Sequence, residues 1–396
     1  MWILLIGGLS LVLLLVVLAL WSASSDDRSA LDDPTNSSTT TPGGTTTTIP
    51  GGTGPGGTAP GGGTAPGGGS TPGGPGSDPG DQEVEPFQPD SLAFGGGSLW
   101  ASDLACGVVI RIDPSTAEVT GSIDVGGSAS GVAYADASVW VGDRAGSQVY
   151  RLDPDDVSIE SLISIPGSAL GLAADDAGVW VVDPAVGAVH EIDAATSELQ
   201  ASVLVGVDPH HVALEPDRAW VTNVGDGTVT RIDRATDQAD ATIATGSGAI
   251  HVEIGEGSAW VTNSRDDTVS RIDPVSGEIT ATIPVGESPH ALAAANGAVW
   301  VGTESGQLWR IDPATNQSTV VPGAEFDSID TAVDGNTVWI ADTFASRIIR
   351  FDTTTATVTA EIALDELGSD CNSFQGGAVV PATPDKVGWP AEDADR

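Results

Sequence analysis

The chain has 396 residues, with 55 acidic and 14 basic side chains and a formal net charge of −41 at pH 7. A surface this acidic repels phosphate backbones, so nucleic acid is excluded as an expected partner. Residues 2–21 are almost wholly apolar, and residues 34–80 are almost wholly Thr, Pro, Gly, Ser and Ala. Neither stretch can form a core, so a globular domain must come from the roughly 300 residues that remain.

The N-terminal apolar segment predicts a helix that crosses a membrane. Residues 2–21 carry no charge and match the length that a helix needs to span the hydrocarbon layer. A cleaved signal peptide is the alternative, but no Lys or Arg precedes the apolar run and no good small-residue cleavage site follows it. We therefore expect residues 1–25 to form an uncleaved signal anchor, with residues 2–21 as the contact with the membrane.

Residues 26–85 predict a disordered stalk, because tracts such as residues 45–48 (Thr) and repeated Pro-Gly-Gly are typical of exposed spacers. Arg28, the only nearby basic residue, follows the helix and argues against export of the C-terminal side. The stalk composition and the even cysteine count argue for export. We expect a single-pass protein of the cell membrane, with its globular domain on the extracytoplasmic side.

Two marks recur through the rest of the chain and decide the fold. A tryptophan returns every 40 residues, with one final interval of 39, at positions 100, 140, 180, 220, 260, 300 and 339. A tripeptide of the type Arg-Ile-Asp follows each one, for example at residues 111–113 and 231–233. A period of about 40 residues indicates a solenoid or a propeller. β-Solenoid coils are usually shorter, which favours the propeller.

Each repeat contains four short runs rich in Val, Ile and Thr that are separated by turn residues, as residues 211–245 show. The pattern predicts an all-β, seven-bladed β-propeller of four-stranded blades over residues 86–370, with a C-terminal tail at 371–396. The tryptophan lies on the second strand and is expected to fill the gap between neighbouring blades. The aspartate that ends the third strand is often followed by Pro, which predicts a type I turn.

The position three residues after each tryptophan also carries a short polar side chain, usually Asp or Asn. A ring of metal ligands around the channel mouth is one interpretation. A hairpin turn whose side chain bonds its own backbone is the simpler one, and we favour it.

The blade sequences resemble known propeller families. Residues 219–223 (Ala-Trp-Val-Thr-Asn) and 259–263 look like the YVTN-repeat propellers, and the frame is similar to that of virginiamycin B lyase (streptogramin lyase) and NHL-type propellers. The resemblance covers residues 90–363 and implies the fold more firmly than the function, because such families share blades but not chemistry. The lyase resemblance implies elimination at a propeller mouth by His and Glu with magnesium. That catalytic set does not map residue by residue, and His251-x-Glu253 is only loosely like it.

Two cysteines leave the closure of the ring open. Cys106 lies between the second and third strands of the first blade, and Cys371 follows the last blade. A disulfide between them would join the two ends of the ring, and free thiols are the alternative.

Histidine is the clearest departure from the repeat. Four of the five histidines lie at the start of the first strand in blades 4, 5 and 6, nine or ten residues before the tryptophan. Since the first strand of a blade is the innermost, we expect them to gather at one mouth of the channel. The ligand-binding candidates are His210, His211, His251, His290 and Asp330. The fifth, His190, lies on a third strand away from the mouth and is interpreted as sequence drift.

The cluster allows two chemistries. His211, His251 and Asp330 could hold a divalent metal such as magnesium or zinc. His211, His251, Glu253 and His290 could supply a general base or acid. Structural histidines at a passive rim are the simplest alternative.

Two functional classes follow. The first, which we favour, is a monomeric, membrane-tethered recognition module for a protein, glycan or small-molecule ligand. The second is a lyase-like or hydrolytic enzyme centred on the histidines.

Overall fold

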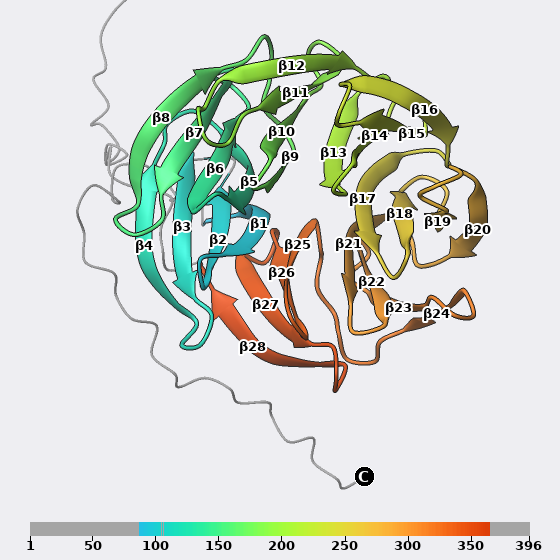
Figure 1. Ribbon diagram of the computed structural model, residues 1–396. Helices are drawn as coiled ribbons and strands as arrows, with labels where there is room; N and C mark the ends of the chain where they lie inside the picture. The colour runs from blue at the N-terminus through green and yellow to red at the C-terminus, as the bar shows by residue number, and fades with distance from the viewer. Residues whose placement is uncertain (1–86, 104, 106, 365–396) are drawn as a thin grey trace, which may run out of the picture. The chain divides into compact units, whose positions relative to one another are not determined.

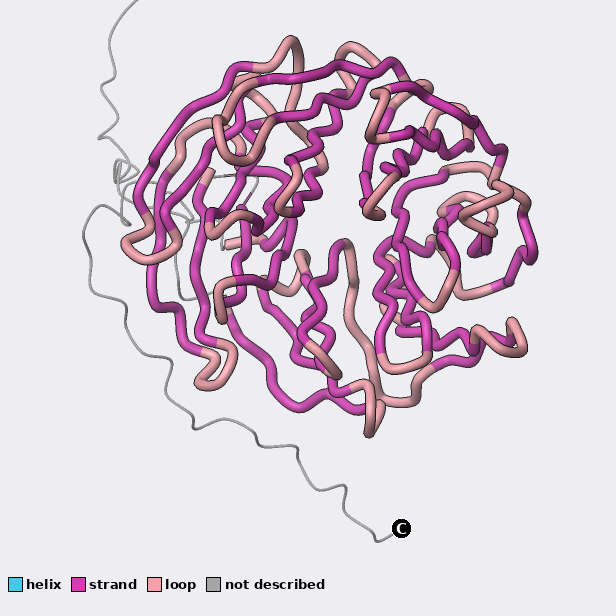
Figure 2. The backbone as a smooth tube through the Cα atoms, in the orientation of Figure 1, coloured by secondary structure: helices cyan, strands magenta, loops and turns pink. Residues whose placement is uncertain are grey.

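The computed structural model describes residues 87–103, 105 and 107–364. They form seven four-stranded antiparallel sheets arranged in a ring, each with its strands in chain order (Figure 1). No described residue belongs to a helix (Figure 2), so the described part of the chain contains no helix that could span a membrane. The predicted all-β, seven-bladed propeller is confirmed. The expected anchor, stalk and tail, with Cys106 and Cys371, lie outside the described residues.

Blade 1 contains β1 (Pro89–Gly95), β2 (Ser98–Asp103), β3 (Val108–Asp113) and β4 (Glu118–Asp124), and blade 2 contains β5 (Ala129–Ala135), β6 (Ser138–Asp143), β7 (Gln148–Asp153) and β8 (Ser158–Ser164). Blade 3 contains β9 (Leu172–Asp175), β10 (Gly178–Asp183), β11 (Ala188–Ile192) and β12 (Leu199–Leu204), and blade 4 contains β13 (Pro209–Leu214), β14 (Arg218–Asn223), β15 (Thr228–Asp233) and β16 (Gln238–Ala244). Blade 5 contains β17 (Ala249–Gly255), β18 (Ser258–Asn263), β19 (Thr268–Ile272) and β20 (Ile279–Pro284), and blade 6 contains β21 (Pro289–Ala295), β22 (Ala298–Thr303), β23 (Leu308–Asp312) and β24 (Gln317–Val320). Blade 7 contains β25 (Asp330–Asp334), β26 (Thr337–Asp342), β27 (Arg347–Asp352) and β28 (Thr357–Ala363).

The repeated tryptophans pack between the blades, as predicted. Trp260 of blade 5, for example, is fully buried against Leu292 and Val299 of blade 6. The arginine of the Arg-Ile-Asp mark lies over the ring, with its guanidinium carbon 5.0 Å from the ring centroid in the pair Arg271–Trp260. The two sequence marks therefore form one repeated unit that joins neighbouring blades.

The polar residues that follow each tryptophan are turn residues. Asp143 Oδ1 accepts hydrogen bonds from the amides of Ala145 and Gly146 in its own hairpin and from Ser128 in the preceding loop. Asn223 Oδ1 accepts from the Gly206 amide in the same way. These side chains tie the hairpin of one blade to the loop that enters it, so the turn interpretation is confirmed.

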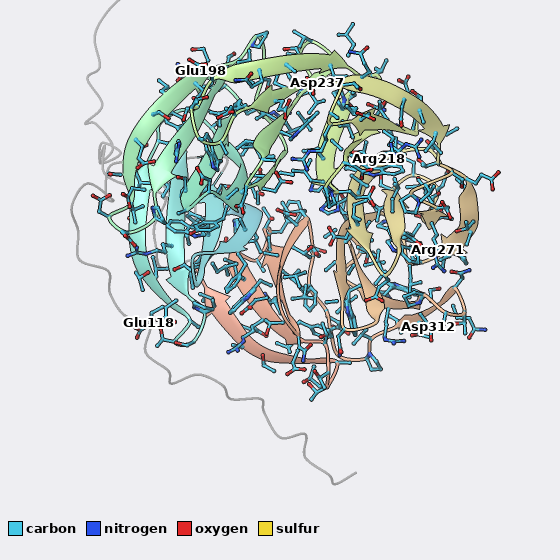
Figure 3. The ribbon with its side chains drawn as sticks, viewed as in Figure 1. Glu118, Glu198, Arg218, Asp237, Arg271 and Asp312 are labelled. Carbon is cyan, nitrogen blue, oxygen red and sulfur yellow. The ribbon has the colours of Figure 1, made fainter. Side chains whose placement is uncertain are left out.

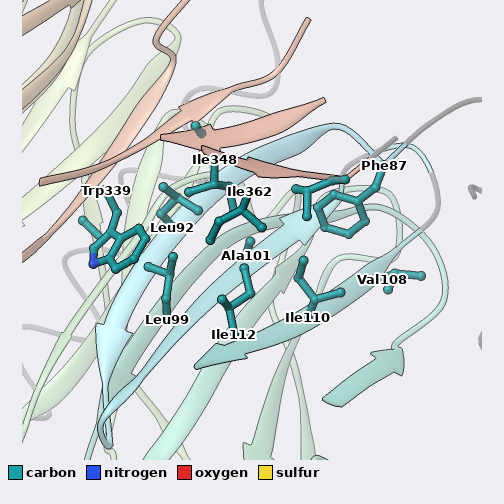
Figure 4. Close-up of a cluster of buried hydrophobic side chains, with 13 residues drawn as sticks. Phe87, Leu92, Leu99, Ala101, Val108, Ile110, Ile112, Trp339, Ile348 and Ile362 are labelled. Atoms are coloured by element: carbon teal, nitrogen blue, oxygen red, sulfur yellow. The ribbon is translucent and has the colours of Figure 1, made fainter. Parts of the chain in front are cut away.

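The ring closes in the described residues by packing of the last blade on the first. Trp339, Ile348 and Ile362 of blade 7 share a buried cluster with Leu99 and Ile112 of blade 1 (Figure 4). Strand β25 lies against β1, and neither sheet borrows a strand from the other.

Polar bonds reinforce this seam. Asp330 Oδ2 accepts from the Ser91 hydroxyl and the Leu92 amide, at 2.8 Å each. Thr343 Oγ1 donates to the Pro89 carbonyl. The described closure is thus non-covalent, and a Cys106–Cys371 disulfide stays a prediction.

Candidate metal centre in the central channel

The first strands of the blades surround the channel, and the repeat fixes the height of each residue along it. The residues nine before the tryptophans form one layer, with the members Ser91, Gly131, Gly171, His211, His251, Ala291 and Asp330. The residues ten before form the next, with the members Asp90, Ser130, Leu170, His210, Ile250, His290 and Ile329. Together the two layers line a cavity of about 150 Å³ at the channel mouth. The predicted gathering of the four histidines is confirmed.

A β-bulge accompanies the histidines of blades 4 and 5, and the first strands of blades 1, 2 and 6 shift register at the same place. The register between first and second strand shifts at Pro209/Val212 in blade 4 and at Ala249/Val252 in blade 5. Bulges re-aim side chains and are frequent beside functional sites.

Threonines of the second strands hold these bulges. The His211 amide donates to Thr222 Oγ1 at 3.0 Å, and the same hydroxyl donates to the Ile250 carbonyl of the next blade at 2.9 Å. Thr262 repeats the arrangement under His251, with the His290 carbonyl as acceptor. The threonine of the Ala-Trp-Val-Thr-Asn motif therefore positions the histidine backbone.

His211, His251 and Asp330 meet in the layer formed by the residues nine positions before the tryptophans. The two imidazole rings stack with centroids 3.7 Å apart and an interplanar angle of 25°. His251 Nε2 lies 3.5 Å from Asp330 Oδ1, beyond the usual hydrogen-bond distance. One donor atom from each of the three residues lies within 4.8 Å of the other two. One ion at their centre could contact all three after small movements of the side chains.

The nitrogens of this cluster are available as ligands. His211 Nδ1 and both ring nitrogens of His251 are buried and make no hydrogen bond within the described residues. Burial first, and the neighbouring His251 second, hold the pKa of His211 well below its ordinary value. The ring is therefore neutral at pH 7 and keeps a lone pair, which metal ligation requires. A buried polar atom left unbonded costs about 1–3 kcal/mol, which a bound ion would recover.

The layer formed by the residues ten positions before the tryptophans contains a second pair of histidines, His210 and His290. The rings of His210 and His290 meet edge to face with centroids 6.0 Å apart. His290 Nδ1 donates to the Ile329 carbonyl at 2.8 Å, which leaves Nε2 as the acceptor nitrogen. Burial, together with His290 and His251, lowers the pKa of His210 to about 3. Burial and the charge of Asp330 raise the pKa of Asp90 to about 6. His210 and His290 are therefore neutral, and neither belongs to the cluster of His211, His251 and Asp330.

Glu253 lies on the other side of the cluster and lines a further cavity of about 340 Å³ together with His211, His251 and Asp330. Burial, and to a lesser degree the charge of Asp330, raise the pKa of Glu253 to about 8. The carboxyl group is therefore largely protonated at pH 7 and can donate a proton or a hydrogen bond into the channel. The other six blades carry alanine at this position: Ala93, Ala133, Ala173, Ala213, Ala293 and Ala332.

The donor set decides which metal fits. Magnesium prefers an all-oxygen shell, whereas two imidazole nitrogens and one carboxylate oxygen suit zinc and similar divalent transition metals. Three protein ligands would leave an open position for a ligand or water. The residues fit a metal of the zinc type better than magnesium.

Sequence reasoning identified all three cluster residues but missed the threonines beneath them and Asp90. The threonines carried a signal, since Thr222 and Thr262 occupy a position where blade 1 has a second hydroxyl residue, Ser102, and the remaining blades have Gly, Val or Ala. Their bonds to the next blade needed the structure. Glu253 was named as a candidate, and its strongest signal is the alanine that replaces it in every other blade.

Comparison with known proteins supports the fold only. No family model and no curated protein matches the sequence. Among solved structures, a streptogramin B lyase superimposes with a TM-score of 0.57 at 16% identity, over 66% of this chain and 92% of that one. Hydrazine synthase of Kuenenia stuttgartiensis gives 0.60 at 16% identity, over 70% and 99%. The computationally designed protein Ika8 gives 0.57 at 16% identity, over 70% and 88%.

The chain is thus similar in fold to a streptogramin lyase, while membership of the YVTN-repeat family stays a prediction. Proteins with these blades include a designed one, so the fold by itself names no activity.

Proposed function

We propose that the propeller is the binding module of a membrane-tethered, extracytoplasmic protein, and that its binding site is the channel. His211, His251 and Asp330 hold a divalent metal of the zinc type there. The observation that carries this proposal is their convergence within 4.8 Å with unbonded imidazole nitrogens.

The surroundings of the cluster suit a small ligand. Cavities of about 150 and 340 Å³ adjoin the cluster, which is room for a small molecule or for one side chain of a partner protein. An anionic oxygen is the natural ligand for the open position of the metal, and the metal would offset the repulsion from this acidic chain.

A thermal-shift experiment on the full-length protein tests the metal site. Zinc, manganese, magnesium or calcium is added after EDTA treatment. A metal that binds only the folded state raises the melting temperature. At a metal concentration of one hundred times its Kd, the free energy of unfolding increases by about 2.7 kcal/mol. We expect zinc to give the largest rise and the rise to disappear in His211→Ala and His251→Ala.

His210→Ala is the matched control, because His210 precedes His211 on the same strand but lies outside the cluster. It should keep the zinc response. An equal response in all three variants, or none in the parent protein, would contradict the proposal.

The tether has its own test. If residues 2–21 anchor the chain and residues 26–85 form an exported stalk, protease added to intact cells should release the propeller. Protection until the cells are lysed would place the propeller on the other side of the membrane.

A metal-dependent lyase or hydrolase is the second candidate, and Glu253 is the observation that favours it. A protonated carboxyl beside a metal cluster can act as a general acid. The streptogramin B lyase in the comparison shares the fold. Turnover of a streptogramin B by the zinc- or magnesium-loaded protein, lost in Glu253→Ala, would favour this candidate over a binding module.

A further inference from the structure

His190 on β11 belongs to a second constellation of side chains, outside the channel. The third strands of the other blades carry Ile110, Tyr150, Thr230, Ser270, Trp309 and Ile349 at this position. His190 is only 1% exposed. Its two ring nitrogens make two different hydrogen bonds, so drift is an insufficient explanation for it.

The first bond orients the ring. His190 Nε2 lies 2.9 Å from Asp183 Oδ2, and Asp183 is fully buried. The other oxygen, Oδ1, accepts from the amides of Ser168 and Ala185. Since a carboxylate oxygen accepts hydrogen bonds, we assign the hydrogen of this bond to Nε2. In the neutral imidazole the other nitrogen, Nδ1, is then an acceptor.

The second bond uses that acceptor. His190 Nδ1 lies 2.8 Å from Ser202 Oγ, so the serine hydroxyl donates its hydrogen to the imidazole. Ser202 is exposed on β12, the outermost strand of blade 3, in a sheet ordered β9-β10-β11-β12. A buried carboxylate, a buried imidazole and an exposed hydroxyl therefore form one hydrogen-bonded chain that ends at the surface. This is the order of groups that activates a serine nucleophile.

The strand register brings the two side chains together and frees an amide. Val205 donates its amide hydrogen to the Gly187 carbonyl, so residues 187 and 205 form a hydrogen-bonded pair. Counting along the register, His190 and Ser202 form a non-hydrogen-bonded pair, in which facing side chains lie closest. The Ser202 amide consequently points away from β11, along the free edge of the blade.

That free amide lies beside the hydroxyl and can donate to a developing oxyanion. Leu204, two residues further on the same face of β12, is 76% exposed and offers apolar surface to an acyl chain.

We propose that Ser202 is a nucleophile, activated by His190 and oriented through Asp183, that takes an acyl group from a carboxylic ester. Its Oγ bonds to the carbonyl carbon while its proton passes to His190 Nδ1. The bond from that carbon to the alkoxy oxygen then breaks, and the leaving oxygen takes the proton from His190. Asp183 keeps the charge of the imidazolium balanced throughout. Water can hydrolyse the acyl-serine by the reverse order of transfers.

The chain contains its own controls. Ser122 of blade 1 occupies the same position on the outermost strand but faces Ile110, so it is a serine without the histidine. Blade 4 replaces the pair Asp183–His190 by Asn223–Thr230, joined by a 3.0 Å hydrogen bond. Asp183→Asn with His190→Thr therefore converts blade 3 to an arrangement that this fold already contains.

The experiment treats the full-length protein with a fluorophosphonate probe and locates the adduct by peptide mass spectrometry, with p-nitrophenyl acetate hydrolysis as a second readout. We expect Ser202 to be labelled about 100-fold faster than Ser122, the size of effect that a general base supplies. Labelling should fall by about the same factor in His190→Thr and in the double variant, and vanish from this peptide in Ser202→Ala.

The melting temperature of each variant shows that the propeller is intact. Ser202 labelling no faster than that of Ser122, or unchanged in a folded His190→Thr protein, would overturn the proposal and leave the histidine as a hydrogen-bonding partner of Asp183.

Discussion

The two sides of the channel differ although they are built from the same repeat. On the side of blades 2 and 3, the residues nine positions before the tryptophans are Gly131 and Gly171. The Gly131 amide donates to the Leu170 carbonyl of the next blade. On the side of blades 4 and 5 the same layer consists of His211 and His251. Backbone closes one side of the channel, and imidazoles line the other. The scaffold is common to all blades, so the departures from it mark the site.

The contrast extends to the bonds between blades. In blades 4 and 5 a threonine hydroxyl bridges to the next blade, whereas blade 3 carries Val182 at that position. Charged side chains such as Glu118, Glu198 and Asp312 lie at the outer rim, at the connections between the third and fourth strands (Figure 3). The channel, in contrast, contains the neutral rings of His210, His211 and His290 and the protonated carboxyl of Glu253.

The largest effect of a single substitution at constant pH is expected on the glycine side. A Cβ added at Gly171 would lie 2.5 Å from the His210 carbonyl oxygen, which is backbone and cannot move freely. Gly171→Ala should lower the free energy of unfolding by about 1–3 kcal/mol, the usual cost of overpacking. Urea unfolding would measure it. Ala291→Gly, at the same height in blade 6, is the control with an expected loss of about 1 kcal/mol. Equal small losses would mean that the two sides are not packed differently.

Asp330→Asn separates the two roles of Asp330. Asparagine keeps an oxygen that accepts from Ser91 and Leu92, so the seam between blades 7 and 1 should stay closed. It loses the charge that a metal requires, and zinc affinity should fall at least about tenfold, which is about 1.4 kcal/mol. Titration calorimetry gives the affinity and thermal unfolding gives the stability. A variant that loses stability but keeps its zinc affinity would make Asp330 a seam residue only.

Glu253 predicts a pH dependence of stability. Its pKa is raised from 4.5 to about 8, so between these values the folded protein holds a proton that the unfolded chain has released. The contribution of Glu253 to the free energy of unfolding should therefore be fully present below about pH 4.5. It should decrease as the pH rises towards 8, by up to about 1.4 kcal/mol per pH unit. Glu253→Ala, which restores the residue of the other six blades, should flatten this slope. Urea unfolding at a series of pH values in EDTA measures the free energy of unfolding of both proteins. If the prediction is wrong, the plots against pH for the parent protein and for Glu253→Ala will be parallel.

The smallest effect is expected from the threonine bridge. Thr262→Val removes the hydroxyl that bonds the His251 amide and the His290 carbonyl, at a cost of about 1 kcal/mol. Zinc affinity should fall as well, because the bridge positions His251. Thr282→Val, on the exposed outer strand of the same blade, should change neither quantity. A change of stability without a change of affinity would show that the histidine holds its position unaided.

The sequence predicted the blades because the 40-residue spacing survives any local ambiguity of strand or turn. It also predicted the height of the histidines, because each first strand starts at a fixed distance from its tryptophan. It could not predict that His211 and His251 stack while His210 and His290 meet in another layer, because a bulge separates adjacent residues in space. Nor could it pair His190 with Asp183 and Ser202, because three strands must be in register before those side chains meet.

The central claim is that His211, His251 and Asp330 form a metal site, and anomalous diffraction at the zinc edge from crystals of the zinc-loaded protein tests it most directly. The account predicts one strong peak in the channel, about 2.0–2.2 Å from a nitrogen of each of the two histidines and from a carboxylate oxygen of Asp330. A channel without such a peak, or zinc bound only at the acidic rim, would contradict it.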